Sequence, residues 1–439
     1  MLNRWLFKQV DNSALVVFRA LFGLLIAIEA FGAIFTGWIR RTLIEPDFTF
    51  NFIGFEFLQP LPGNGMLWYY GIMGVFGIFV MLGFKYRLSI VCYGIMWAAV
   101  YLMQKSSYNN HYYLLMLLCI IMSFLPANRW FSLDAKIKPE ISKISMPRWV
   151  WVVIVLQLWI VFTYASVAKL YPDWLDGSFP ALLMRSKADY WLVGEILQQG
   201  WVRYAITYFG LLFDLLIIPL LFWKRTRLPA FIAAIFFHLF NSFIFHIGIF
   251  PYMSLAFSIF FFPTEKINKW FLRNRKKYYD KGEIIIPPYR NLLIAAMSIW
   301  FIIQVCLPLR HWFFKDDVLW TEEGHRLSWR MMLRGKSGRI TFKVVEKGAI
   351  DTVFVNKKDY LSRKQLRAIS TKPDMIWQFV QRIEEEYVEK GKEVEIYAEG
   401  KISVNGGPYK PLIDPKVDLA AEKWQHFRHH DWILPSDSE

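Results

Sequence analysis

The sequence predicts a mainly α-helical, polytopic membrane bundle of about nine spans, followed by an extracytoplasmic α+β domain. Hydrophobic residues make up 55% of the 439 residues and aromatic residues 18%. Apolar runs of about 18 or more residues recur, which is the length that a bilayer core of about 30 Å requires. After about residue 308, charged residues and strand-like alternation replace these runs. We therefore expect a helical bundle over residues 1–308 and an α+β domain over residues 309–439.

Nine apolar runs are the expected spans. They cover approximately residues 14–36, 66–84, 87–104, 111–126, 149–168, 202–223, 228–247, 249–263 and 291–308. The segment before the first run, MLNRWLFKQVDNS, has no small-residue cleavage site. We expect the first run to be retained as a span rather than removed as a signal peptide. Nine crossings place the two chain ends on opposite sides of the membrane.

The distribution of basic residues predicts the orientation. The formal net charge is +15, and most lysines and arginines lie in short segments between apolar runs. They concentrate in the amino-terminal segment and in alternate loops, above all residues 129–148 and 266–290. Positively charged loops stay in the cytoplasm, so we expect a cytoplasmic amino terminus and an extracytoplasmic carboxyl-terminal domain. Membrane lipid is the expected surrounding, and nucleic acid is not an expected partner.

Two expected outer segments are long and aromatic. Residues 37–65 alternate aromatic residues before the turn-forming PLPGNG, which suits a strand or an interfacial lid. Residues 170–200 include Trp191–Leu197, which suits an amphipathic helix on the bilayer surface. Both segments could cover a cavity.

The carboxyl-terminal domain shows strand and helix patterns. ITFKVV and TVFV alternate as strands, residues 362–390 form a charged amphipathic pattern, and EVEIYAEGKISVNGGPYKPLI indicates a strand, a turn and a second strand.

Polar residues inside the runs fall at one depth. Lys169 ends the fifth run, Asn109, Asn110 and His111 open the fourth, and His238, Asn241 and His246 occupy the outer part of the seventh. With the predicted orientation, all lie toward the outer leaflet and indicate a polar pocket that opens outward. Each also has a plainer interpretation: Lys169 as a lysine that extends to the headgroups, and the histidines and asparagines as partners in helix–helix hydrogen bonds.

Other polar groups give weaker indications. Cys92, Cys119 and Cys306 lie within apolar runs and show neither disulfide nor metal-thiolate spacing. His426, His429 and His430 lack an accompanying carboxylate or cysteine pattern, so we expect no metal site. Arg40 and Arg41 suit interfacial anchoring better than anion binding. The chain has no nucleophile-elbow serine, phosphate loop or dinucleotide glycine motif.

Several longer stretches resemble one known family. They include FRALFGLL, KSSYNNHYYLL, ANRWFSLD, YASVAKLYPDW and FFHLFNSFIFHIGIFPYMSLAFS, followed by LPLRH, LSWRMM, IDPKVDLA and WILP. In this order the chain is similar to the vitamin K-dependent gamma-glutamyl carboxylase family, whose membrane part is called the HTTM domain. It most resembles the bacterial members, which implies an inner-membrane protein with its outer domain in the periplasm.

The resemblance implies addition of CO2 to the γ carbon of a glutamate side chain in a peptide or protein. The implied cofactor is reduced vitamin K, a naphthohydroquinone, with O2 as co-substrate and no metal. In this family a lysine removes a proton from the quinol, and the oxygenated quinol then removes the γ proton of glutamate and leaves as an epoxide. A lysine beside hydrocarbon suits the first step, because desolvation favours the neutral amine.

The resemblance also implies roles for individual residues. Lys169 matches the family's base, and His111 and Asn110 match a histidine and an asparagine that support catalysis. Asn109, His238, Asn241, Ser242 and His246 are implied to bind the cofactor, and His325, Trp329 and Met331 to contact the glutamate.

The sequence also departs from the family pattern. The family's paired lysines correspond to Ala168-Lys169, and His325 stands where a tyrosine is expected. Two alternatives therefore stand beside carboxylation. One is a quinol oxygenase that forms the epoxide without carboxylating anything, and the other is a non-catalytic quinone-binding or transport protein.

Overall fold

The computed structural model describes residues 1–348 and 352–437 and is built on nine apolar helical segments within those ranges. They are α2 (Ser13–Phe35), α3 (Gly65–Leu82), α4 (Tyr86–Met103), α5 (Asn110–Phe124), α7 (Arg148–Val167), α11 (Gly200–Phe222), α12 (Arg227–Phe245), α13 (Phe250–Phe257) with η4 (Ser258–Phe261), and α15 (Arg290–Leu309). Seven of them are long and apolar enough to cross a membrane, whereas α5 and α13–η4 are shorter. This confirms the predicted polytopic helical bundle, and each expected span agrees with its helix within two residues at either end.

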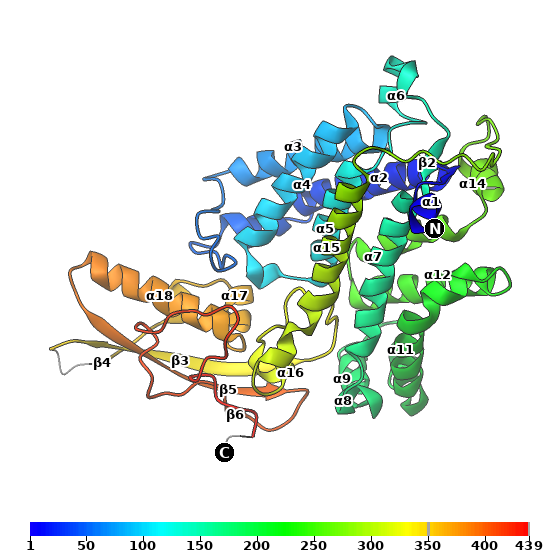
Figure 1. The fold of residues 1–439 in the computed structure, drawn as a ribbon. Helices are drawn as coiled ribbons and strands as arrows, with labels where there is room; N and C mark the ends of the chain where they lie inside the picture. The colour runs from blue at the N-terminus through cyan, green and yellow to red at the C-terminus, as the bar shows by residue number, and fades with distance from the viewer. Residues whose placement is uncertain (349–351, 438–439) are drawn as a thin grey trace.

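One end of the bundle gathers the basic loops, and we call it the basic end. Strand β1 (Gln9–Asp11) pairs with β2 (Ser145–Pro147), and Lys8 bridges to Ile284. Arg275 donates hydrogen bonds to the Asp11 Oδ1 atom (2.8 Å) and the Asn12 Oδ1 atom (2.6 Å). The amino terminus and the loops before α7 and α15 are therefore tied together (Figure 1). The short helices at this end are α1 (Leu2–Leu6), α6 (Leu133–Ile137), η3 (Pro139–Ile141) and α14 (Thr264–Phe271).

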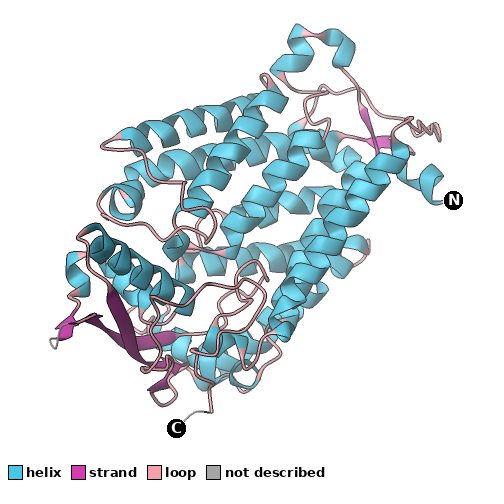
Figure 2. Cartoon of the chain, turned by 60° about the vertical axis from the view of Figure 1, so that its left-hand side comes forward, coloured by secondary structure: helices cyan, strands magenta, loops and turns pink. Residues whose placement is uncertain are grey.

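The opposite end carries the α+β domain, which we call the roof. Its antiparallel sheet has the strand order β4-β3-β5-β6, with β3 (Lys336–Glu346) and β5 (Val394–Val404) paired along their full lengths. Helices α17 (Arg363–Ile369) and α18 (Pro373–Glu389) cover the sheet, and the Phe379 ring meets the Phe342 ring at 5.0 Å. Figure 2 shows the roof strands gathered away from the amino terminus. The remaining roof elements are η5 (Arg310–Phe313), α16 (Val318–Thr321), β4 (Thr352–Phe354), η6 (Lys357–Asp359) and β6 (Lys410–Pro411).

Glycines allow the first helices of the bundle to pack closely. A Cβ atom added at Gly23 of α2 would lie 2.2 Å from the backbone nitrogen of Met81 in α3. One added at Gly77 of α3 would lie 2.8 Å from the backbone nitrogen of Ala27. The two backbones therefore approach to distances that only small residues permit, as is common between membrane helices.

The loops between spans dock the roof onto the bundle. The Phe50 side chain, from the segment before α3, is fully buried in the roof core. The Asn405 Nδ2 atom donates to Asp173 in α8 (Pro172–Leu175) at 2.7 Å, and the Tyr171 hydroxyl donates to the Leu333 carbonyl. Together with η2 (Lys105–Ser107), whose Lys105 pairs with Asp374, these contacts place the loops at this end of the bundle beneath the roof.

The structure differs from three of the sequence predictions for loops and helices. Residues 37–65 contain the π-helical turn η1 (Arg40–Ile44) and otherwise run as a loop instead of a strand. Residues 170–200 form α8, α9 (Ser178–Arg185) and α10 (Gly194–Leu197). The charged pattern at 362–390 is split into α17 and α18, because Pro373 pushes the preceding Lys372 into an extended conformation.

Candidate functional site

A cavity of about 530 Å³ lies in the bundle beneath the roof, between α5, α7, α11, α12 and α13. We call it the bundle cavity. Most of its lining is aromatic or aliphatic, and Met331 and Met332 of the roof close one side. The charged and polar side chains on the lining are Lys169, Asp214, His111, His238 and Asn241. It has the size and the mixture of apolar walls with few polar groups that small-molecule sites share.

Lys169 is buried on this cavity. Only 7% of the residue is exposed, and its ammonium pairs with the Asp214 carboxylate in α11. The Lys169 Nζ atom also lies 5.4 Å from the centre of the Trp174 ring. The side chain therefore reaches neither bulk water nor the headgroup region, and its position fits the polar-pocket interpretation rather than the anchoring one.

The end of α7 fixes the position of Lys169. The Ser166 hydroxyl donates to the Leu211 carbonyl at 3.0 Å, which joins the last turn of α7 to α11. Helix α7 ends at Val167, and Pro172 begins the separate helix α8 after an extended Tyr171. Lys169 thus leaves the helix beside the turn of α11 that carries Asp214.

Two histidines face the same cavity from other helices. His111 lies in the first turn of α5, and its ring stacks on Phe250 with 4.2 Å between ring centres. His238 in α12 meets the edge of Phe250 at 6.1 Å and that of Phe213 at 5.6 Å. Phe250 therefore contacts both imidazoles, and Asn241 lines the cavity one turn after His238.

Two predicted asparagines support the site without lining the cavity. The Asn109 side chain caps α5 by accepting a hydrogen bond from the Tyr112 backbone N–H at 2.8 Å. The Asn110 amide donates to the Arg330 carbonyl at 2.9 Å and accepts a hydrogen bond from Tyr108 at 2.7 Å. Asn110 thus holds the start of α5 against the roof, next to Met331.

Four other predicted residues lie away from the cavity lining. Ser242 shares a hydrogen bond with Tyr252 on an exposed face at 3.0 Å, and His246 terminates α12 with a φ of 52°. His325 is buried in the roof with its Nε2 atom 2.7 Å from Arg334. The Trp329 ring stacks on Tyr113 at 4.9 Å.

The segment Gly324–Met332, which we call the septum, separates two cavities. Met331 and Met332 line the bundle cavity, whereas Gly324, Arg326 and Leu327 line a second cavity. Leu327, Trp329 and Met332 all adopt positive φ, at 60°, 58° and 51°. Left-handed backbone is unfavourable for such residues and persists only where the surroundings impose it, often at functional sites.

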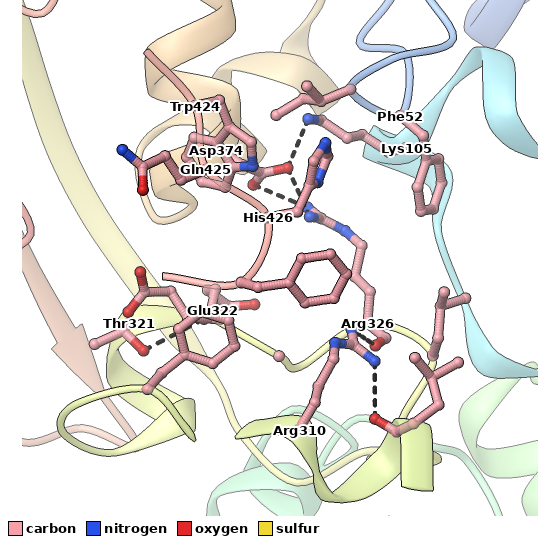
Figure 3. Close-up of a pocket in the computed structure, with 17 residues that line it drawn as sticks. Phe52, Lys105, Arg310, Thr321, Glu322, Arg326, Asp374, Trp424, Gln425 and His426 are labelled. Atoms are coloured by element: carbon pink, nitrogen blue, oxygen red, sulfur yellow. Dashed lines mark hydrogen bonds and ion pairs between the residues drawn. The ribbon is translucent and has the colours of Figure 1, made fainter. Parts of the chain in front are cut away.

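The second cavity, the roof cavity, has a volume of about 270 Å³ and is rich in charge (Figure 3). Lys105 and Arg326 both point to Asp374, with their nitrogen atoms 2.6 Å from its Oδ2 atom. Burial lowers the pKa of Lys105 to about 8, although Asp374 opposes that shift. Burial alone would raise the pKa of Asp374, but Arg326 and Lys105 outweigh it and hold the pKa below its usual value.

Arg310 is the cation of this cavity that has no carboxylate partner among the residues the structure describes. Its guanidinium donates to the carbonyls of Leu307 (3.0 Å) and Arg326. The other two carboxylates on the lining are already engaged, Glu322 with Arg334 and Glu323 with His429. Arg310 therefore presents a positive charge that no carboxylate contacts directly within the described residues, and this charge could attract an anion.

Asp214, Arg310 and Asp374 are the site residues that sequence reasoning missed. Asp214 carried a usable signal, because it is the single acidic residue in the run over residues 202–223. A carboxylate inside a span indicates a function by default. Arg310 also carried a signal, because it directly follows the apolar run over residues 291–308 and lies in LPLRH, one of the stretches that resemble the family. Asp374 lies among many other charged residues of the roof sequence and had no comparable signal.

Two family models match the chain over nearly its whole length. Residues 7–266 match the model described as HTTM domain. Residues 289–439 match the model described as Vitamin K-dependent gamma-carboxylase, lumenal domain. No solved structure matches the chain. The first match covers the bundle up to α14, and the second covers α15 and the roof.

Replacing Asp374 with asparagine should destabilise the roof and its contact with the bundle. The substitution leaves Lys105 and Arg326 buried without a counter-charge, which costs about 3–5 kcal/mol of unfolding free energy. Glu385→Gln, which breaks an exposed ion pair in the same helix, should cost less than about 0.5 kcal/mol. Thermal unfolding of both variants in detergent measures the difference, and equal stabilities would contradict this interpretation.

The pKa of Asp374 predicts that the stability of the protein depends on pH. This carboxyl has a lower pKa in the folded state than the value of about 3.9 in an unfolded chain. Its contribution to stability is therefore complete above about pH 4 and is lost as pH falls below that value. Asp374→Asn should lack this part of the acid-induced loss of stability.

Proposed function

This chain belongs to the vitamin K-dependent gamma-carboxylase family, and from that premise we propose that it couples oxygenation of a reduced vitamin K-type quinol to carboxylation of glutamyl side chains by CO2. The observation that carries the proposal is Lys169, buried beside hydrocarbon on a cavity that it shares with His111. The second cavity, with its unpaired arginine, supports a separate route for a glutamyl substrate.

The bundle cavity fits a naphthoquinol. Its long apolar walls suit fused rings and an isoprenoid tail, and its few polar groups suit the two ring hydroxyls. Trp201 and Phe236 line the cavity and are 65% and 66% exposed on the lipid-facing surface of α11 and α12. A lipid-soluble quinol would enter between these helices directly from the bilayer.

When bound, reduced vitamin K together with O2 would supply a base that is stronger than any side chain near neutral pH. In this proposal Lys169 receives the proton of a quinol hydroxyl. His111 and His238 hold the opposite side of the ring system across Phe250. Asn110 positions His111 by fixing the start of α5 to the roof. The mostly apolar lining of the cavity would disfavour water, which would otherwise consume reactive species.

The glutamyl side chain would enter through the roof cavity. Its γ-carboxylate would bind Arg310 through charge-assisted hydrogen bonds. The septum, with Trp329 and Met331, lies between the two cavities, and the γ carbon next to this carboxylate would have to reach past it to the quinol. In this arrangement His325 supports the septum through Arg334 without touching the substrate.

We also propose that the roof is extracytoplasmic, because the basic end gathers the loops rich in lysine and arginine. Cysteines introduced at Lys138 and at Lys347, in a chain whose own three cysteines are replaced, test this orientation. A membrane-impermeant maleimide applied to intact cells should label the Lys347→Cys protein alone. Labelling of Lys138→Cys alone would reverse the assignment.

Purified protein given reduced vitamin K, O2, labelled bicarbonate and a short glutamyl peptide should incorporate label and form the quinone epoxide. Lys169→Ala should lower both rates by at least about 10²-fold, because the base is lost. Lys187→Ala is the matched control, since that lysine contacts Tyr190 outside the cavity.

The outcomes separate the candidate functions. Epoxide without label would favour a quinol oxygenase that does not carboxylate. Neither product would favour a non-catalytic quinone-binding or transport protein. Unchanged rates in Lys169→Ala would refute the assigned base.

Arg310→Gln should raise the KM for the glutamyl peptide by about 10- to 100-fold, the expected loss for a hydrogen bond to a charged group. The KM for the quinol should stay unchanged, because Arg310 does not line the bundle cavity. Arg339→Gln, which removes an exposed arginine of β3, serves as the control. A normal peptide KM in Arg310→Gln would exclude the roof cavity as the carboxylate site.

A further inference from the structure

Asp214 is a buried carboxylate that the proposed chemistry has not yet used. It lies in α11 with 6% of its surface exposed, and it is the only acidic residue on the lining of the bundle cavity that the structure describes. Its carboxylate pairs with the Lys169 ammonium, and no other charged group within the described ranges forms an ion pair with it. Trp174, which lies over the ammonium, belongs to the same wall.

This pair creates a difficulty for a lysine that acts as a base. An ammonium has three N–H donors and no lone pair, so Lys169 cannot accept a proton while it carries its own. In the structure its nitrogen is in direct contact with the Asp214 carboxylate, which is the arrangement of an ion pair. Lys169 therefore needs a proton acceptor before it can receive another proton.

We propose that Asp214 is that acceptor. Lys169 and Asp214 then act together as one base: Lys169 takes a proton from the quinol and passes its own proton to Asp214. This inference rests on the proposed function, because it concerns the quinol that the bundle cavity would hold. In the step, the proton of a quinol hydroxyl forms a bond with the Lys169 nitrogen. The proton that Lys169 carried forms a bond with an Asp214 carboxylate oxygen.

The charges balance throughout this transfer. The electron pair of the broken O–H bond stays on the quinol oxygen, whose negative charge then faces the Lys169 ammonium. Before the transfer the ammonium is neutralised by Asp214, and afterwards it is neutralised by the ligand. No isolated charge is left in the apolar cavity at either stage, which would cost several kcal/mol.

The neighbouring helices offer two other titratable groups. His111 of α5 and His238 of α12 face the cavity, and both contact Phe250. Neither forms a hydrogen bond or an ion pair with Asp214 in the structure. The roof contributes Met331 and Met332, which do not titrate. Asp214 is therefore the acceptor that lies in direct contact with Lys169.

Infrared difference spectroscopy tests the proposal without relying on turnover. Reduced phylloquinone is added to the full-length protein in the absence of O2, and the carbonyl stretch of a protonated carboxyl group is followed. We expect this band to appear in the wild type and to be missing in Asp214→Asn. Glu29→Gln is the matched control, because Glu29 is another carboxyl among the helices, bound to Tyr112 at 2.6 Å and outside the bundle cavity. It should keep the band.

Epoxide formation provides a second readout. Asp214→Asn should bind the quinol but form epoxide about 10²- to 10⁴-fold more slowly, the range expected for loss of a positioned acid–base group. Asp214→Glu should keep both the band and part of the activity, which separates chemistry from a fault in folding. Size-exclusion profiles check that each variant is intact.

Two results would overturn the inference. A band that persists in Asp214→Asn would assign the proton to another group, such as His111 or His238. Epoxide formation by Asp214→Asn at or above the wild-type rate would mean that Lys169 acts alone and that Asp214 only restrains it. A wild-type protein that neither binds quinol nor forms epoxide would instead refute the proposed function, and the inference with it.

Discussion

The contact between the Lys169 ammonium and the Asp214 carboxylate sets the main constraint on this structure. Both side chains are more than nine-tenths buried among aromatic residues, where each ion loses its hydration. Two such charges are tolerable only in direct contact, so α7 and α11 must be fixed against each other. The bond from Ser166 to the Leu211 carbonyl does this one turn before Asp214. The cavity and its histidines are arranged around that pair.

A second group of buried charges lies where the roof meets the bundle. Lys105 comes from the bundle, Arg326 from the septum and Asp374 from α18, and their charges meet at one point. The same contact that docks the roof therefore also positions the septum between the two cavities. The bundle cavity is mostly apolar, and the roof cavity is rich in charge. A lipid-soluble ligand in the first and a polar peptide in the second would lie on opposite sides of the septum. This division suits the proposed reaction, in which the oxygenated quinol removes a proton from a glutamyl side chain that then receives CO2.

Much of the fold could be predicted from the sequence, because hydrophobic length and charge distribution act locally. The nine spans, the position of Lys169 at the end of the fifth and the histidine-bearing turns of α5 and α12 follow from those patterns. Asp214 did not emerge as the partner of Lys169, because it lies 45 residues away and only helix packing joins the two. His246 caps the end of α12, where its ring meets Tyr190, and Ser242 bonds to Tyr252. Phe48 and Phe50 lie in a loop and insert their side chains into the roof core, a contact that the alternation of aromatic residues did not reveal.

An experimental map of the protein with a bound, non-reactive vitamin K quinone tests the central claim most directly. The account predicts density for the ring system inside the bundle cavity, with one ring oxygen beside the Lys169 nitrogen and the other side of the ring facing His111. Density for the ring system in the roof cavity, or on the outer surface of the bundle away from Lys169, would contradict it.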